Sequence, residues 1–235
     1  MDKTWYLDLN QIARESAWAH RLVTDFVDGL PPSLGFGLLA LMVIILGALW
    51  SARRTAPERV PAVAWAGLAG AIALGLNLIL LPVLAQPRPY QVIANVEVLV
   101  PRATGYAMPN GHCAIAGAVV CGLALARRWR WVIAAAVVAL ALMFCLVYAG
   151  ADYPSDVAAG VGFGAAVGVV LWPLGAWLLD PLTESVAASA LGWLVTSRTA
   201  RTRRPIGRGS PANLPDARAM AALRKATEAA RQTHS

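Results

Sequence analysis

The sequence predicts an all-α integral membrane protein: a helix bundle of about five transmembrane helices, preceded by an amphipathic N-terminal helix. Of the 235 residues, 58% are hydrophobic and only 14% are charged, whereas soluble domains carry about 25% charged residues. The mean hydropathy is +0.57. The apolar residues also form long runs, and about 20 such residues suffice to cross a bilayer.

Five apolar runs are the candidate transmembrane helices, at residues 34–50, 61–84, 111–126, 131–148 and 157–179. The third run is short for a full span, so we expect its start to lie in a polar cavity rather than in lipid. In the fifth run Gly160, Gly164 and Gly168 recur every four residues, which favours close helix packing inside the bundle. A dimer contact is the alternative use of these glycines.

The chain divides into three predicted parts. Residues 1–30 mix apolar and charged side chains in the manner of an amphipathic helix that lies on a membrane surface. Residues 31–196 form the membrane-embedded domain. Residues 197–235 are rich in Arg, Pro, Gly and Ser, so we expect a basic and largely disordered tail. The three cysteines lie within apolar runs without a CxxC pair and are typical of small buried hydrophobic residues.

The arginines predict the orientation of the chain in the membrane. They follow the first run, separate the third from the fourth, and fill the tail, so with five crossings all three basic segments share one side. Short basic loops mark the cytoplasmic face. We therefore expect a multi-pass membrane protein with a cytoplasmic tail. This explains much of the +7 net charge, and no motif indicates nucleic-acid binding.

Three short polar motifs collect on the opposite, outer side. A charge at the centre of a membrane helix costs about 2.5–3.5 kcal/mol, so such groups persist where they are paired or functional. An arginine, a histidine at a helix start and the N–H groups of that helix suit a phosphate. The motifs are QPRPY with Arg88, MPNGH with Asn110, Gly111 and His112, and YAGADYPSDVAAG with Asp152 and Asp156.

The order and spacing of these motifs resemble the type 2 phosphatidic acid phosphatase family, whose fold is a membrane helix bundle. The family pattern is K-x6-R-P, then P-S-G-H, then S-R-x5-H-x3-D, and the resemblance covers roughly residues 81–160. The segment LNQIARES at residues 9–16 also resembles the bacterial undecaprenyl-diphosphatase branch. The resemblance implies a lipid phosphate phosphatase or diphosphatase that needs no cofactor and no metal.

The resemblance also assigns roles to individual residues. Arg88 matches a phosphate ligand, and Asn110 and Gly111 stand in the second motif, where Asn110 replaces a serine. His112 matches the acid that protonates the leaving oxygen, and Asp156 matches the aspartate that orients the nucleophile.

Several positions depart from the family pattern. Leu81 replaces the lysine, Cys145 and Leu146 replace the serine and arginine of the third motif, and Asp152 replaces the nucleophilic histidine. The chain has thus lost cations at a site where phosphoryl transfer needs them, and it has gained a carboxylate. The usual phosphohistidine intermediate is impossible at position 152.

Two carboxylates repel a phosphate unless their charge is compensated. Three compensations are open: Arg88 or Arg102 pairs with Asp152, a divalent cation binds both aspartates, or Asp152 itself attacks phosphorus and forms an acyl phosphate. In a fourth interpretation, Arg88, His112 and the two aspartates form a buried polar cluster that only holds the helices together.

The leading hypothesis is a membrane protein that handles polyprenyl or other lipid (di)phosphates at the outer face. The rival is a catalytically silent protein that binds lipid phosphate, or a membrane scaffold or subunit for another enzyme, with a membrane protein or a second copy as its partner. A small transporter is disfavoured, because the sequence shows no internal repeat and no pair of helices broken by Gly and Pro.

Overall fold

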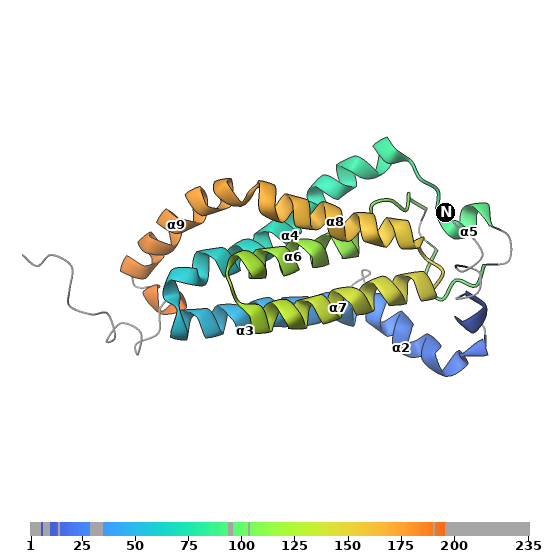
Figure 1. Ribbon diagram of the computed structural model, residues 1–235, viewed down its shortest axis with the longest axis horizontal. Helices are drawn as coiled ribbons and strands as arrows, with labels where there is room; N and C mark the ends of the chain where they lie inside the picture. The colour runs from blue at the N-terminus through green and yellow to red at the C-terminus, as the bar shows by residue number, and fades with distance from the viewer. Residues whose placement is uncertain are drawn as a thin grey trace, which may run out of the picture. The chain divides into compact units, whose positions relative to one another are not determined.

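The computed structural model describes Tyr6 and residues 10–13, 15–28, 35–93, 96–102, 104–189 and 191–195. Within these ranges every regular element is a helix, which confirms the all-α class (Figure 1). The predicted tail at residues 197–235 lies outside the described residues. The elements are α2 (Ala17–Asp28), α3 (Phe36–Thr55), η1 (Pro57–Arg59), α4 (Val60–Leu84), α5 (Pro89–Val92), α6 (Gly111–Leu125), α7 (Trp129–Tyr148), α8 (Pro154–Val170), α9 (Trp172–Ala188) and η2 (Gly192–Leu194).

The apolar runs of the sequence correspond to helices that are able to cross a membrane. By length and composition, α3, the stretch Pro57–Val92 that contains α4, and α7 qualify on their own, and α8 with α9 qualifies as one bent span. The described residues thus hold three or four such spans. α6 has only 15 residues, or about 22 Å, as expected for the short third run.

The prediction of one continuous helix over residues 157–179 is wrong, because α8 and α9 meet at a 55° bend. Pro173 explains this break. Its ring cannot donate a backbone hydrogen bond and clashes with the carbonyl four residues earlier, so α8 ends at Val170. The next helix starts at Trp172, where Pro173 sits in the first turn and its missing N–H costs no bond.

α6 is the central helix of the bundle and packs against α8, α4, α7 and α3 (Figure 1). Its contact with α8 is close because glycines face backbone on both sides. A Cβ added at Gly164 would collide with the carbonyl oxygen of Ala114, and one added at Gly117 would collide with that of Val161. This arrangement confirms that the four-residue glycine pattern serves packing inside the bundle.

The outward faces of the helices are apolar. On α7, the side chains of Ile133, Val137, Leu140 and Phe144 follow one another at helical spacing and are all exposed. A soluble monomer seldom exposes such a continuous apolar stripe. The stripe is the surface that a membrane helix presents to lipid.

The polar segments lie at opposite ends of this bundle. α7 has 20 residues, or about 30 Å, which matches the thickness of the hydrocarbon layer. Arg128 precedes this helix and Asp152 follows it. α4 runs in parallel from Arg59 to the segment that holds Gln86 and Arg88, so the basic loops share one end and the three motifs share the other.

Candidate functional site

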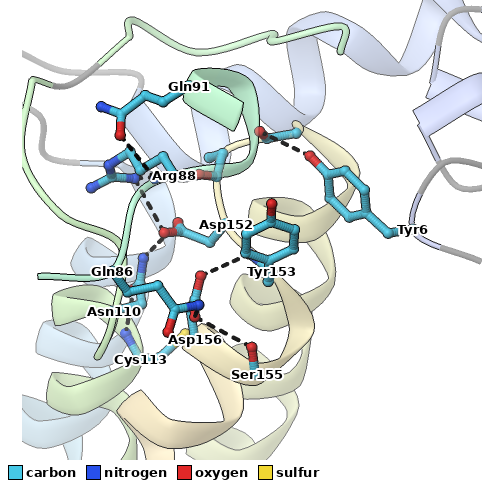
Figure 2. A network of polar contacts seen from close by, with 12 residues as sticks. Tyr6, Gln86, Arg88, Gln91, Asn110, Cys113, Asp152, Tyr153, Ser155 and Asp156 are labelled. Carbon is cyan, nitrogen blue, oxygen red and sulfur yellow. Dashed lines mark hydrogen bonds and ion pairs between the residues drawn. The ribbon is translucent and has the colours of Figure 1, made fainter. Parts of the chain in front are cut away.

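Three chain segments meet at the end of the bundle where α4 ends and where α6 and α8 begin (Figure 2). Ala85 ends α4 in the left-handed conformation, with a φ of 48°. The residues that follow, Gln86 and Arg88, contact Asp156 and Asp152. Asn110 precedes the first turn of α6, and Tyr153 precedes that of α8. The motifs are therefore neighbours in space although they are far apart in the sequence.

Asp152 is the centre of this cluster and is completely buried. Its Oδ1 accepts a hydrogen bond from Nη1 of Arg88 at 3.1 Å, and its Oδ2 accepts one from Nδ2 of Asn110 at 2.8 Å. Figure 2 shows both donors pointing at the carboxylate. Pairing with Arg88 is one of the compensations that the sequence left open. The guanidinium of Arg102 lies over the ring of Tyr90, 5.9 Å from its centroid.

Asp156 is also fully buried, but its partners are different. Its Oδ2 accepts from the backbone N–H of Tyr153 at 3.0 Å, and its Oδ1 accepts from Nε2 of Gln86 at 3.0 Å and from the hydroxyl of Ser155 at 3.3 Å. The carboxylate thereby caps the N-terminus of α8, where negative charge is stabilising. Gln86 is a site residue that the sequence analysis missed, although it belongs to the first motif.

Asn110 connects the start of α6 to both aspartates. Its Oδ1 accepts from the N–H of Cys113 at 3.1 Å and caps the helix, while its Nδ2 bonds to Asp152. Its backbone N–H donates to the carbonyl of Asp156 at 3.1 Å. A carboxamide has separate donor and acceptor atoms, so this one side chain serves both the helix cap and the buried carboxylate.

Gly111 and His112 form the first turn of α6, directly after Asn110. Gly111 lies against α4, since a Cβ at this position would approach Nδ2 of the buried Asn77 to 3.2 Å. His112 is partly exposed. The roles of Gly111 in phosphate binding and of His112 as an acid remain predictions.

An N-terminal segment packs directly on the site, which the sequence analysis missed. The hydroxyl of Tyr6 donates to the carbonyl of Gly150 at 3.2 Å, and its ring centroid lies 5.4 Å from that of Tyr153. Asn10 exchanges two hydrogen bonds with the backbone of Glu97, at 2.8 and 2.9 Å. The signal for this contact is that Tyr6 and Asn10 lie four residues apart, on one helix face.

The opposite face of this amphipathic segment exposes Ile12, Trp18 and Leu22. If the segment lies on the membrane surface, this exposed apolar face is the one that contacts lipid. The surface location itself stays a prediction. The inward face rests on protein, where Ala13 and Val23 pack against Tyr148 and the turn that follows it.

Burial dominates the electrostatics of the site. Desolvation raises the pKa of Asp152 to about 7, and although the positive charge of Arg88 opposes this rise, it does not cancel it. The negative charge of Asp156 adds to the rise, and the hydrogen bond from Asn110 opposes it. Burial also raises the pKa of Tyr6, with smaller effects from Tyr153 and Asp152. Burial therefore favours the protonated form of Asp152 up to a much higher pH than for an exposed aspartate.

A divalent cation between the aspartates finds no support in this geometry. Each carboxylate oxygen of Asp152 and Asp156 already accepts an N–H or O–H donor. Within the described ranges, no three His, Cys, Asp or Glu side chains gather in a way that could hold a metal ion.

Comparison with known proteins relates both the sequence and the fold to membrane phosphatases. The profile described as PAP2 superfamily matches residues 62–179, which is half of the chain. An undecaprenyl-diphosphatase from Sulfolobus acidocaldarius is 32% identical over 109 residues, covering 46% of this chain and 47% of the relative. The match thus spans about half the length of that relative.

Two solved structures share the fold. LpxE from Aquifex aeolicus superposes with a TM-score of 0.51 at 20% identity, over 71% of this chain and 94% of the other. A PAP2-type phosphatidylglycerolphosphate phosphatase from Bacillus subtilis gives a TM-score of 0.52 at 19% identity, over 75% and 87% of the two chains. At these identities the likeness concerns the helical bundle alone.

Proposed function

Because this chain belongs to the PAP2 superfamily, we propose that it handles polyprenyl or other lipid phosphates and diphosphates at the outer face of the bacterial cytoplasmic membrane. The observation that carries this proposal is the pairing of Arg88 and Asn110 with Asp152 at one end of a membrane bundle. The similarity to a relative named undecaprenyl-diphosphatase supports the substrate class.

The orientation follows from the distribution of charge. Arg53, Arg59 and Arg128 lie at the end of the bundle away from Asp152, and short basic segments favour the cytoplasmic side. The site then faces outside and the C-terminal tail is cytoplasmic. An outer site is open to a lipid diphosphate whose headgroup lies in the outer leaflet.

In the proposed reaction Asp152 takes the place of the histidine nucleophile. The guanidinium of Arg88 first releases the carboxylate of Asp152 and binds the oxygens of the phosphate. An oxygen of Asp152 then bonds to phosphorus while the bond from phosphorus to the leaving oxygen breaks, and His112 protonates that oxygen. Water next attacks the phosphorus of the acyl phosphate and returns a proton to His112. Inorganic phosphate leaves, and the carboxylate of Asp152 is restored.

A silent lipid-phosphate-binding protein is the second candidate, and a specific observation favours it. Asp152 has 0% exposure and is already paired with Arg88. A nucleophile in this state is inaccessible, and the cations that a phosphate needs are fewer than the family pattern provides. In this case the chain binds lipid phosphate without turnover, or serves as a membrane scaffold or subunit for another enzyme, alone or as a homodimer.

A phosphate-release assay separates the two candidates. Purified protein in detergent is given undecaprenyl diphosphate, with Mg²⁺ and separately with a chelator. If the chain is an enzyme, the wild type releases phosphate in both conditions. The Asp152→Asn and His112→Ala variants then lose this activity. Asp180→Asn is the matched control, since it removes an exposed carboxylate of α9. Absence of release from the wild type, with lipid phosphate still bound, would favour the silent candidate.

A further inference from the structure

The end of the bundle opposite the site carries arginines that are built into the junction of several helices. Nη2 of Arg128 donates to the hydroxyl of Ser51 at 2.6 Å, and its Nη1 donates to the hydroxyl of Thr55 at 3.3 Å. Nη1 of Arg59 donates to the carbonyl of Arg127 at 3.4 Å. These bonds hold the turn between α6 and α7 against the end of α3 and the start of α4.

The positive charge of this junction is not balanced. In the part of the chain that the structure describes, Arg59 and Arg128 form no ion pair with a carboxylate, and the ion pair that is present joins Arg88 to Asp152 at the other end. Burial, and then the charges of Arg59 and Arg130, lower the pKa of Arg128, while Glu58 opposes this only in part. The cluster therefore repels itself unless an anion is added.

Hydrogen-bond donors are also left over at this junction. Nε of Arg128 and Nε1 of Trp131 are buried and have no acceptor among the described residues. The ring of Trp131 lies against Gly47, one turn before Ser51 on α3, so the side chains of Arg128 and Trp131 both contact the same face of α3. Because the unpartnered groups are donors, the missing partner is an acceptor.

Tryptophans place this junction at the level of lipid headgroups. Trp50 and Trp129 are exposed here, and Arg54 stacks on the ring of Trp50 at 3.8 Å. Tryptophan is enriched where a membrane meets water. Arg128 directly precedes the first turn of α7, whose backbone N–H groups add donors that suit a phosphate.

We propose that Arg59, Arg128 and the start of α7 bind the phosphate of an anionic phospholipid headgroup. Charge complementarity selects an anion, the unused donors select an oxygen-rich one, and the exposed tryptophans select a ligand anchored in the bilayer. This lipid site is separate from the site around Asp152 and does not depend on the function proposed for it.

Native mass spectrometry of the full chain tests this lipid site. Protein in detergent is mixed with phosphatidylglycerol or with phosphatidylcholine, and the lipid-bound fraction is measured. We expect preferential retention of phosphatidylglycerol. Arg59→Gln should weaken its binding about fivefold, the factor that corresponds to about 1 kcal/mol for one basic group. Arg21→Gln is the control, since it removes an exposed arginine of α2, away from this junction, and should change binding less than twofold.

Arg128→Gln should weaken binding as well, but it also breaks the bonds to Ser51 and Thr55. The decisive variant is therefore Arg59→Gln, whose side chain makes one long hydrogen bond to the residues that the structure describes. Equal retention of the two lipids would overturn the proposal, and so would wild-type binding by Arg59→Gln or an equal loss in Arg21→Gln. Displacement of the lipid by an equal concentration of glycerol 3-phosphate would assign the site to a free phosphate and refute its lipid character.

Discussion

Asp152→Asn replaces the buried carboxyl group that accepts hydrogen bonds from both Arg88 and Asn110. An asparagine retains one acceptor oxygen and turns an NH₂ group toward a second donor. One of the two hydrogen bonds is therefore lost. At pH 5, where the wild-type carboxyl is largely protonated, the variant should be less stable by about 1–3 kcal/mol, the cost of a buried group without its partner.

The difference should change with pH because only the wild type titrates at this position. Burial raises the pKa of Asp152 to about 7, so the folded protein holds a proton that the unfolded chain has released. The stability that such a group contributes to the folded protein is lost as the pH rises from the pKa of the unfolded chain to the pKa of the folded protein. At about 1.4 kcal/mol per pKa unit, the wild type should lose about 3 kcal/mol between pH 5 and pH 8 that the variant keeps.

Thermal unfolding in detergent at pH 5, 6, 7 and 8 measures this difference. A free energy of about 3 kcal/mol corresponds to about 6–12 °C for a chain of this size. The wild type should therefore lose its advantage over Asp152→Asn as the pH rises. Asp180→Asn, which alters an exposed carboxylate of α9, should follow the wild type at every pH. A constant difference between wild type and Asp152→Asn would refute the reasoning, because Asp152 would then not titrate in this range.

Two further predictions concern packing and the N-terminal segment. Gly164→Ala should lower the free energy of unfolding by about 1–3 kcal/mol, because the added methyl group collides with the carbonyl of Ala114. Gly162→Ala, on the open side of the same helix, should have no such cost, and equal melting temperatures of the two variants would contradict this explanation. Asn10→Ala should speed hydrogen exchange at the amide of Glu97 about 5- to 30-fold, since it removes about 1–2 kcal/mol of hydrogen bonding. Unchanged exchange there would mean that Asn10 does not hold this loop.

The fold was largely predictable because hydropathy determines where membrane helices lie. The runs at residues 61–84, 111–126 and 131–148 differ from α4, α6 and α7 by no more than two residues at either end. The prediction for the fifth run was wrong at Pro173. Mean hydropathy does not detect a missing backbone N–H or the clash of a proline ring with the preceding turn. The glycine spacing in the same run correctly predicted close helix packing, because two helix backbones can touch only where a residue has no Cβ.

The site was predictable as a set of residues but not as a set of contacts. The motifs correctly predicted that Arg88, Asn110 and Asp152 are neighbours. Only the folded chain shows that Arg88, three residues after the left-handed turn at Ala85, is the arginine that pairs with Asp152. The contact of Tyr6 was hidden for a different reason. An amphipathic pattern is the same whether its buried face meets lipid or protein, so only the structure distinguishes the two.

The most direct test of a lipid-phosphate site is an experimental structure of the protein with undecaprenyl phosphate bound. We expect the phosphate oxygens to lie about 3 Å from the guanidinium of Arg88 and from the N–H groups at the start of α6, with Asp152 displaced from Arg88. A phosphate bound elsewhere, with the ion pair of Arg88 and Asp152 still intact, would contradict the account and leave these residues as a structural cluster.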